Sequence, residues 1–217
     1  IQVSRPDKHG FVSLGTSVDA TLAAVENADI VVAQVNKHVP RAWGDAMISL
    51  KQIDYVVEHD EPLYIHHNAP LSDIEKAIGE NCASLIEDGS TLQLGIGAIP
   101  DAVLLFLKDK KDLGIHTEMF SDGVLELVEA GVINNSKKTL HNGKMISTFL
   151  MGTKRLYDFV DNNPDVELYP VDYVNHPAVI MQNENLVSIN SCLQVDLMGQ
   201  VSSESIGLTQ FSGVGGQ

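Results

Sequence analysis

Short apolar runs of strand length alternate with amphipathic helical patterns along this chain, and that alternation limits the fold more than any other feature. Residues 30–35 form an apolar run that is typical of a buried strand. The preceding residues 17–27 place Val18, Leu22 and Val25 on one face of a helix. Because helices and strands alternate in this way, we expect an α/β fold with an open, mostly parallel sheet flanked by helices.

A change in composition before the next strong helix predicts a boundary between two domains. Residues 60–70 are polar and contain proline, and Ser72 and Glu75 then form a capping box ahead of an amphipathic helix. We therefore expect the end of one domain in residues 1–70 and most of a second domain in residues 71–217.

A glycine-containing loop connects a predicted strand at residues 91–94 to a predicted helix at residues 101–107. The loop contains Gly95 and Gly97. Backbone N–H groups and the positive end of the helix dipole can face a phosphate or a developing oxyanion there. Two other interpretations stay open. The glycines could serve only close packing of the helix on the sheet, and a dinucleotide site is disfavoured because Pro100 replaces the third glycine of that fingerprint.

Glu118 follows a predicted strand at residues 113–116, which places its carboxylate at the C-terminal edge of a parallel sheet. Ligands bind at this edge in open α/β sheets, and the Gly95 loop belongs to the same edge. We therefore expect Glu118 near that loop, although a solvated loop acid is the simpler alternative. Asp122 is expected to be the N-cap of a helix that starts near Gly123.

Asn175 follows the apolar run 169–174, which has strand character. This pattern predicts a second sheet-edge position, where the asparagine amide could donate to an oxyanion. Because Asn175 precedes His176 and Pro177, the local sequence is equally typical of a turn asparagine.

Composition excludes several classes of function. Fourteen basic residues stand against 29 acidic ones, and the net charge of -15 argues against nucleic acid as a partner. No apolar run is long enough to cross a bilayer, so no membrane partner is expected. The two cysteines, Cys82 and Cys192, indicate neither a disulfide scaffold nor a zinc site, and a reducing cytoplasm fits them best. The histidines lack metal-ligand spacing, so no metal site is expected.

Read together, several of these segments resemble one family, the acetyl-CoA hydrolase/transferases. The matching segments, in order, are residues 6–11, 95–103, 116–123, 174–177 and 213–216. The resemblance extends over essentially the whole chain, and it implies tandem domains of the CoA-transferase type (NagB/RpiA-type). The chain begins with isoleucine and stops in a glycine-rich run, so we expect an internal fragment of a longer protein, with further CoA contacts outside it.

The resemblance also implies roles for individual residues. Glu118, in a Thr-Glu motif, corresponds to the catalytic carboxylate, and Asn175 and Gly216 correspond to groups near the reacting carbonyl oxygens. The residues that correspond to CoA contacts are Gly95, Ile96, Gly97, Ala98, Ile99, Ser212 and Gly216.

The implied reaction is transfer of CoA between an acyl-CoA and a short carboxylate, in ping-pong order through a glutamyl-CoA thioester. A carboxylate nucleophile suits this transfer because every intermediate stays activated. The expected pair is 4-hydroxybutyryl-CoA and acetate, with butyrate or propionate next. CoA is then a substrate, no permanently bound cofactor is expected, and a homodimer or higher homo-oligomer is the expected assembly. Two alternatives stay open, an acyl-CoA hydrolase that uses the same glutamate and a non-catalytic CoA-binding module.

Overall fold

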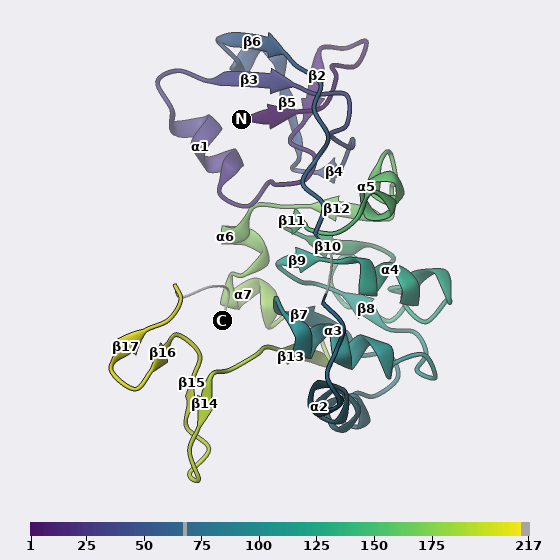
Figure 1. Cartoon of the computed structure of the whole chain (residues 1–217). Coiled ribbons are helices and arrows are strands. Elements are labelled where there is room, and N and C mark those ends of the chain that lie inside the picture. The colour runs from purple at the N-terminus through teal and green to yellow at the C-terminus, as the bar shows by residue number, and fades with distance from the viewer. Residues whose placement is uncertain (67–68, 214–217) are drawn as a thin grey trace.

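The computed structural model describes residues 1–66 and 69–213 and has the α/β architecture expected from the sequence. A smaller N-terminal unit lies at the top of Figure 1, and a larger unit built on parallel strands lies below it. The chain passes from one to the other between β6 (Tyr55–Glu58) and α2 (Asp73–Ser84). Whether the domain boundary falls at residue 70 stays a prediction.

The N-terminal unit combines a parallel sheet with an antiparallel strand pair. Besides β6, its elements are β1 (Gln2–Val3), β2 (Phe11–Ser13), α1 (Thr21–Asn27), β3 (Val32–Val35), β5 (Met47–Ser49) and the 3₁₀ helix η1 (Leu50–Gln52). The parallel sheet has the order β1-β3-β6, and β2 pairs with β5. Helix α1 starts later than predicted because the Asp19 carboxylate accepts hydrogen bonds from the N–H groups of Ala20 and Thr21, which turns the chain there.

The larger unit is organised around parallel strands in the order β13-β7-β8-β10-β12-β4. An isolated parallel bridge between His116 and Ile146 joins its two three-stranded halves. The strands are β4 (Trp43–Gly44), β7 (Thr91–Leu94), β8 (Gly114–Ile115), β10 (Met145–Ser147), β12 (Val166–Leu168) and β13 (Leu186–Ile189). Strand β4 comes from the N-terminal unit, so the two units share one edge of this sheet. The mostly parallel sheet is therefore confirmed.

Helices flank the strands of the larger unit. In Figure 1, α4 and α5 lie to the right of the strands, and α6 and α7 lie to the left. Besides α2, the helices are α3 (Ala98–Leu105), α4 (Asp122–Glu129), α5 (Lys154–Val160), α6 (Val171–Val174) and α7 (Pro177–Ile180). The predicted capping box opens α2, since Ser72 and Glu75 each accept a hydrogen bond from the other's backbone N–H.

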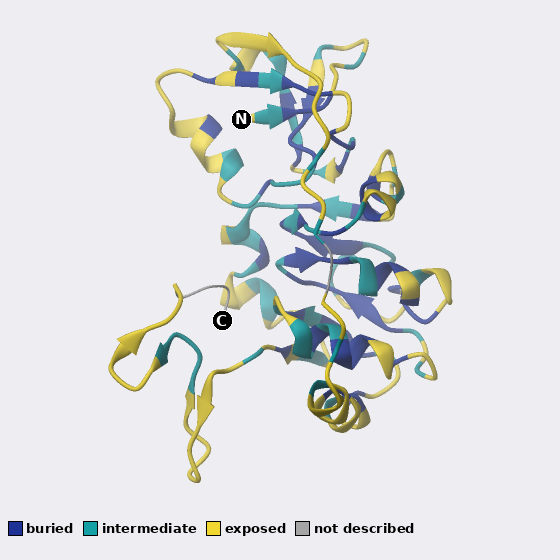
Figure 2. Cartoon of the chain, in the orientation of Figure 1, coloured by how far each residue is buried: buried dark blue, intermediate teal, exposed yellow. Residues whose placement is uncertain are grey.

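The core runs through the centre of the sheet, where Figure 2 shows buried strands between exposed helices and loops. Leu92, Ile115 and Phe120 are fully buried on neighbouring strands. Complete burial of an apolar side chain of this size contributes about 1.5–3 kcal/mol. The strands that end at the glycine loop and at Glu118 are therefore among the best anchored in the molecule.

Two adjacent strands bend at the same level. Strand β8 continues past a bend as β9 (Met119–Phe120), and β10 continues as β11 (Phe149–Leu150). Strands β9 and β11 pair in parallel beyond the bend. Glu118 lies at the bend itself, so its side chain leaves the regular ladder at the edge of the sheet.

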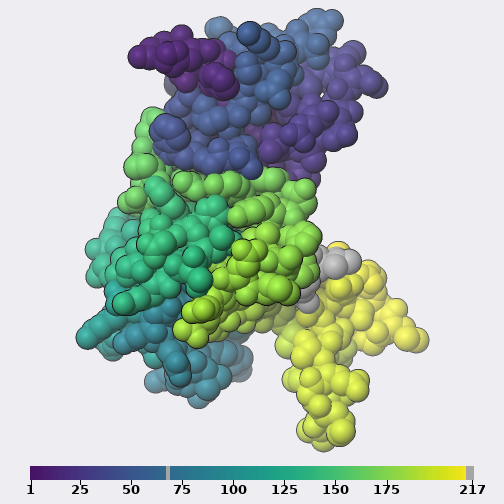
Figure 3. Space-filling view, turned by 180° about the vertical axis from the view of Figure 1, so that it is seen from behind, coloured from purple at the N-terminus to yellow at the C-terminus, as the bar shows by residue number. Residues whose placement is uncertain are grey.

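Residues 191–213 form an arm made of two antiparallel pairs, β14 with β15 and β16 with β17. Its strands are β14 (Gln194–Val195), β15 (Val201–Ser202), β16 (Ser205–Ile206) and β17 (Thr209–Gln210). Figures 1 and 3 show the arm, in yellow-green to yellow, standing off the body of the molecule.

Three further sequence predictions about local structure are wrong. The run 169–174 is not a strand, because Pro170 lacks a ladder N–H and becomes the N-cap of α6. Ser121, not Asp122, is the N-cap of α4, and the Asp122 carboxylate instead accepts hydrogen bonds from Thr153. Helix α3 begins at residue 98 rather than 101, with Gly97 as its N-cap.

Candidate active site

The main chain of Glu118 is held tightly at the bend between β8 and β9. Its carbonyl oxygen accepts hydrogen bonds from the backbone N–H groups of Thr148, at 2.9 Å, and Phe149, at 3.2 Å. The hydroxyl groups of Ser147 and Thr148 donate to the same oxygen at 2.8 and 3.2 Å. The position of Glu118 is therefore set by the neighbouring strand pair β10 and β11.

Glu118 is half-buried, and among the described residues its carboxylate has one direct side-chain partner. The Nδ2 group of Asn175 donates to Oε2 at 2.6 Å. Within the described residues, the other oxygen, Oε1, accepts no hydrogen bond. Asn175 is the C-cap of the short helix α6, so a helix end rather than a strand end carries this amide. One carboxylate oxygen is thus bound by an amide donor while the other is open for chemistry.

The glycine loop lies at the same edge of the sheet, where close packing requires small residues. A Cβ atom at Gly95 would lie 2.6 Å from Oδ1 of Asn190 and 3.2 Å from the Ile189 carbonyl, so any larger residue would have to displace the Asn190 side chain. Gly97 has φ of +122°, a backbone conformation that L residues rarely adopt. The N–H of Gly95 donates to the carbonyl of Ile189, so it is used within the fold.

The remaining N–H groups of the loop are available to a ligand. Within the described residues, the backbone N–H groups of residues 96–99 donate to no carbonyl in a turn or loop. Ala98 and Ile99 open α3, whose first turn leaves its N–H groups without helical partners. Pro100 follows them and has no N–H. This set of donors fits a phosphate or a developing oxyanion.

A cleft of about 360 Å³ brings together several of the residues predicted from the sequence. It is lined by Gly95 and Ile96 from the loop, by Glu118, and by Ser212 from the arm. Gly97 and Ala98 line an adjoining cleft of about 310 Å³, and Met119 and Ile96 line both. Ile99 lines neither of these two clefts.

Asn175 and Gly216 are the remaining contacts predicted from the sequence. Asn175 lies outside the 360 Å³ cleft but reaches Glu118 directly. Gly216 lies outside the described residues, so its predicted role stays a prediction.

Two buried titratable groups lie directly behind the site. Burial lowers the pKa of His116 to about 4, and the Val174 carbonyl that accepts from its Nε2 opposes that shift. Burial likewise lowers the pKa of Lys138 to about 7, although Nζ donates to the carbonyls of Ile115 and Lys144. Sequence reasoning missed both residues. Their only sequence signal was the position of His116 in the segment that contains Glu118.

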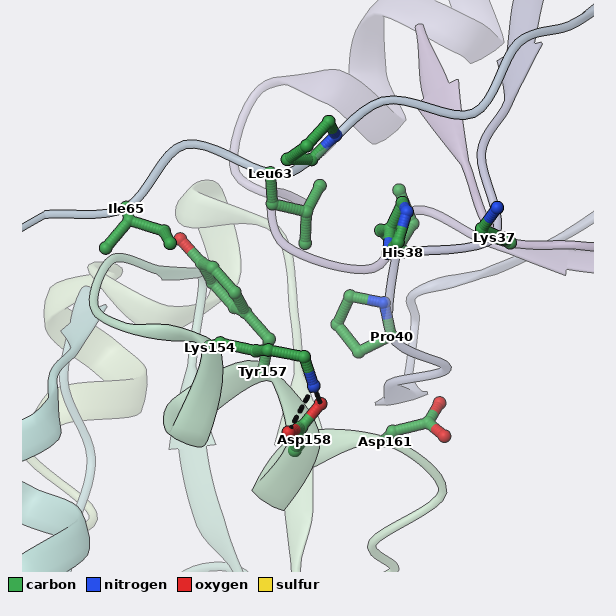
Figure 4. Close-up of a pocket in the computed structure, with 11 residues that line it drawn as sticks. Lys37, His38, Pro40, Leu63, Ile65, Lys154, Tyr157, Asp158 and Asp161 are labelled. Carbon is green, nitrogen blue, oxygen red and sulfur yellow. Dashed lines mark hydrogen bonds and ion pairs between the residues drawn. The ribbon is translucent and has the colours of Figure 1, made fainter.

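A third cleft, of about 350 Å³, shares no lining residue with these two (Figure 4). It is lined by residues 37–40, by the connecting segment near Leu63 and by α5. Its lysine at position 154 is paired with Asp158, as the dashed lines of Figure 4 show. None of the site residues predicted from the sequence lines it. The candidate active site is therefore the cleft at Glu118.

Metal and membrane features are absent from the part of the chain that the structure describes. Over residues 1–66 and 69–213, no group of three or more His, Cys, Asp or Glu side chains is placed to hold a metal ion. Among the same residues, no helix has both the length and the apolar character that crossing a membrane requires.

Comparison with known families identifies the chain. The model of the acetyl-CoA hydrolase/transferase N-terminal domain matches residues 1–65, and that of the C-terminal domain matches residues 152–217. This chain belongs to the acetyl-CoA hydrolase/transferase family. The resemblance that the sequence motifs suggested is thereby confirmed.

The relatives of this family member include several named CoA-transferases. The 4-hydroxybutyrate coenzyme A transferase of Clostridium kluyveri is 70% identical over 100% of this chain and 51% of its own length. The succinyl-CoA:acetate/propanoyl-CoA:succinate CoA transferase of Fasciola hepatica is 52% identical over 100% of this chain and 46% of its own.

A solved structure agrees with the fold. The crystal structure of 4-hydroxybutyrate CoA-transferase from Porphyromonas gingivalis matches with a TM-score of 0.89 and 55% identity, over 92% of this chain and 51% of that one. The chain thus spans about half the length of the relatives that it matches.

Proposed function

We propose that this chain carries the nucleophile of a CoA-transferase, which moves CoA between a short acyl-CoA and a carboxylate through a thioester on Glu118. The observation that carries the proposal is the environment of the Glu118 carboxylate, with one oxygen bound and the other, among the described residues, free at the cleft. Oε2 accepts a hydrogen bond from Asn175 at 2.6 Å, and the side chain lines the cleft that the glycine loop also lines. The names of the similar transferases support the same reaction class.

The first half of the reaction forms an anhydride. Oε1 of Glu118 attacks the carbonyl carbon of the acyl-CoA, and the C–S bond breaks to release CoA thiolate. No general base is needed, because a carboxylate has no proton to lose before it attacks. The oxyanion on the acyl oxygen needs N–H donors, which the free groups at residues 96–98 on the lining of the two adjoining clefts can supply. Each is worth about 3–4 kcal/mol by analogy with measured oxyanion holes.

The second half places charge on Glu118 itself. The CoA thiolate attacks the side-chain carbonyl carbon of Glu118, which turns Oε2 into the oxyanion before the acyl carboxylate leaves. Asn175 already donates to Oε2. We therefore assign Asn175 to this oxyanion. The product is a glutamyl-CoA thioester, and an acceptor carboxylate reverses both steps.

Binding of CoA must overcome the acidity of this chain, whose net charge is -15. Local N–H donors at the start of α3 can hold a phosphate without a basic side chain. Ser212 lines the same cleft from the arm and is a candidate contact. Basic residues beyond this chain are expected to supply the remaining contacts with the CoA phosphates.

The substrates that we infer are 4-hydroxybutyryl-CoA and acetate, with butyryl-CoA close behind, and CoA serves as substrate rather than resident cofactor. This choice is supported by similarity to proteins named 4-hydroxybutyrate CoA-transferases. We also infer a homo-oligomer in a reducing cytoplasm, the latter supported by two free cysteines in the described residues.

An assay of thioester loss with and without acetate tests the proposal. The full-length protein is given 4-hydroxybutyryl-CoA, and both acetyl-CoA and free CoA are measured. A transferase forms acetyl-CoA in amounts that match the acyl-CoA lost. Equal loss without acetate would instead identify a hydrolase that uses the same glutamate. Unchanged turnover of the full-length Glu118→Ala variant would contradict both, and it would favour a non-catalytic, CoA-binding role for this part of the protein.

A further inference from the structure

The residues immediately before Glu118 have side chains that reach two other segments of the site. His116 and Thr117 are both fully buried, with 1% and 0% exposure. Neither touches the cleft at Glu118. Their hydrogen bonds nevertheless end one residue away from Asn175 and one residue away from the glycine loop.

The Thr117 side chain takes the place of a main-chain hydrogen bond between β7 and the segment that follows β8. The last main-chain bond between β7 and β8 runs from the His116 N–H to the Leu92 carbonyl, at 3.0 Å. One step further along, the Thr117 hydroxyl accepts from the N–H of Leu94 and donates to its carbonyl, both at 3.0 Å. Leu94 is the residue before Gly95. A single side chain therefore fixes the start of the glycine loop relative to Glu118.

His116 performs the equivalent task on the other side of the site. Its Nε2–H donates to the carbonyl of Val174 at 2.9 Å. Val174 is the last residue of α6, and Asn175 follows it as the C-cap. Within the described residues, Nδ1 of His116 is buried without a partner, so the Val174 bond is the one that orients this ring.

These contacts converge on a common function, and the inference rests on the proposed CoA-transferase reaction. We propose that His116 and Thr117 are positioning residues, which hold the Asn175 amide and the glycine-loop donors at reaction distance from the Glu118 carboxylate. Three consecutive residues then link the nucleophile to three segments. His116 reaches α6, Thr117 reaches the end of β7, and the Glu118 carbonyl reaches β10 and β11.

The geometry gives the two positioning residues different kinetic signatures. Loss of the His116 donor frees Asn175, which acts on the oxyanion at Glu118, so kcat falls by about 10- to 100-fold while KM for acyl-CoA stays within about 2-fold. Loss of the Thr117 hydroxyl shifts the loop that faces CoA, so KM for acyl-CoA rises by about 10-fold or more. A residue with only a structural role would lower the folded fraction without separating these constants.

The test uses the full-length protein with paired substitutions. His116→Leu removes the donor, whereas His116→Gln keeps an amide N–H near the position of Nε2. Thr117→Val removes the hydroxyl, whereas Thr117→Ser keeps it. Steady-state exchange between 4-hydroxybutyryl-CoA and acetate is measured for all four, normalised to folded protein by circular dichroism. We expect the Gln and Ser variants to stay within about 5-fold of wild type in both constants.

Each outcome decides the inference. The predicted separation of kcat and KM, with recovery in the Gln and Ser variants, supports it. The inference is overturned if kcat falls and KM rises to the same extent in both the His116 and the Thr117 variants. It is also overturned if the Gln and Ser variants are as impaired as the Leu and Val variants. In either case, exchange activity in the wild type leaves the proposed function standing. If the Leu and Val variants do not fold, the two side chains serve the fold rather than the geometry of the site, and the inference is overturned. A wild-type protein without exchange activity overturns the proposed function and this inference together.

Discussion

The two walls of the cleft at Glu118 are built in different ways. The sheet wall is made from the end of β7, the glycine loop and residues 118–119, which follow strands that carry the fully buried Leu92 and Ile115. The arm wall comes from residues 191–213, where Leu197 and Leu208 are fully exposed at 106% and 107%. Both walls line one cleft, but only the sheet wall is held by a buried core.

This difference separates chemistry from binding. The carbonyl of Glu118 is bound from β10 and β11, and its carboxylate is bound from α6, so the reacting atoms depend on the body of the protein. Ser212 reaches the cleft from the arm, whose hydrogen bonds are mostly internal. We therefore expect changes in the sheet wall to alter turnover and changes in the arm wall to alter CoA affinity.

The largest expected effect is at the nucleophile. Glu118→Gln keeps the size of the side chain but removes the carboxylate, so kcat for CoA exchange should fall by at least about 10³-fold. Glu129→Gln is a matched control, because this exposed glutamate of α4 pairs with Arg155 at the surface, away from the cleft. A Glu118→Gln variant with near-normal turnover would break the assignment of chemistry to the sheet wall.

The amide partner of the nucleophile comes next. Asn175→Ala removes the donor to Oε2, and by analogy with a single oxyanion-hole donor kcat should fall by about 10²- to 10³-fold. KM for acyl-CoA should change little. Asn27→Ala on α1, far from the cleft, provides the control. A rise in KM with unchanged kcat would show that Asn175 serves binding rather than the oxyanion.

Local sequence signals predict part of the sheet wall, but not the contacts between distant residues. The strand at 91–94, the capping box of α2 and the position of Glu118 at the sheet edge follow from periodicity and local signals. The strand-like reading of residues 169–174 failed because an apolar run does not distinguish strand from helix once Pro170 interrupts it. The links from His116 and Thr117 are non-local, since they join residues 58 and 23 positions apart, and no local pattern encodes such pairs.

Acid should weaken the sheet wall through His116. Burial lowers the pKa of this imidazole to about 4, with the charges of Lys138 and His141 acting in the same direction. As the pH falls below 6.5, the unfolded chain takes up a proton at this residue before the folded protein does. Stability is therefore lost as the pH falls from about 6.5 toward 4.

The measurement for this effect is the free energy of unfolding in urea at pH 7.5 and 4.5, for the wild type and for His116→Gln. Relative to the variant, the wild type should lose on the order of 2 to 3 kcal/mol over this range. Lys138, with its pKa lowered to about 7, also changes protonation between these two pH values, but it does so in both proteins, so the comparison with the variant removes its contribution. Equal losses of unfolding free energy in the two proteins would show that His116 is not buried as a neutral group.

The smallest expected effect is in the arm. Ser212→Ala removes one hydroxyl from the cleft, so KM for acyl-CoA should rise by only about 2- to 10-fold, with kcat unchanged. Ser136→Ala, at an exposed site away from the cleft, is the control. A fall in kcat without a change in KM would contradict the division between the two walls.

The most direct test of the central claim is to trap the covalent intermediate on Glu118. The full-length protein is incubated with acetyl-CoA and no acceptor acid, treated with borohydride to reduce a thioester, digested and examined by peptide mass spectrometry. The account predicts a mass change confined to the peptide that contains Glu118. An unmodified Glu118 peptide, in a sample whose turnover has been confirmed, would show that the acyl group moves directly or through another residue.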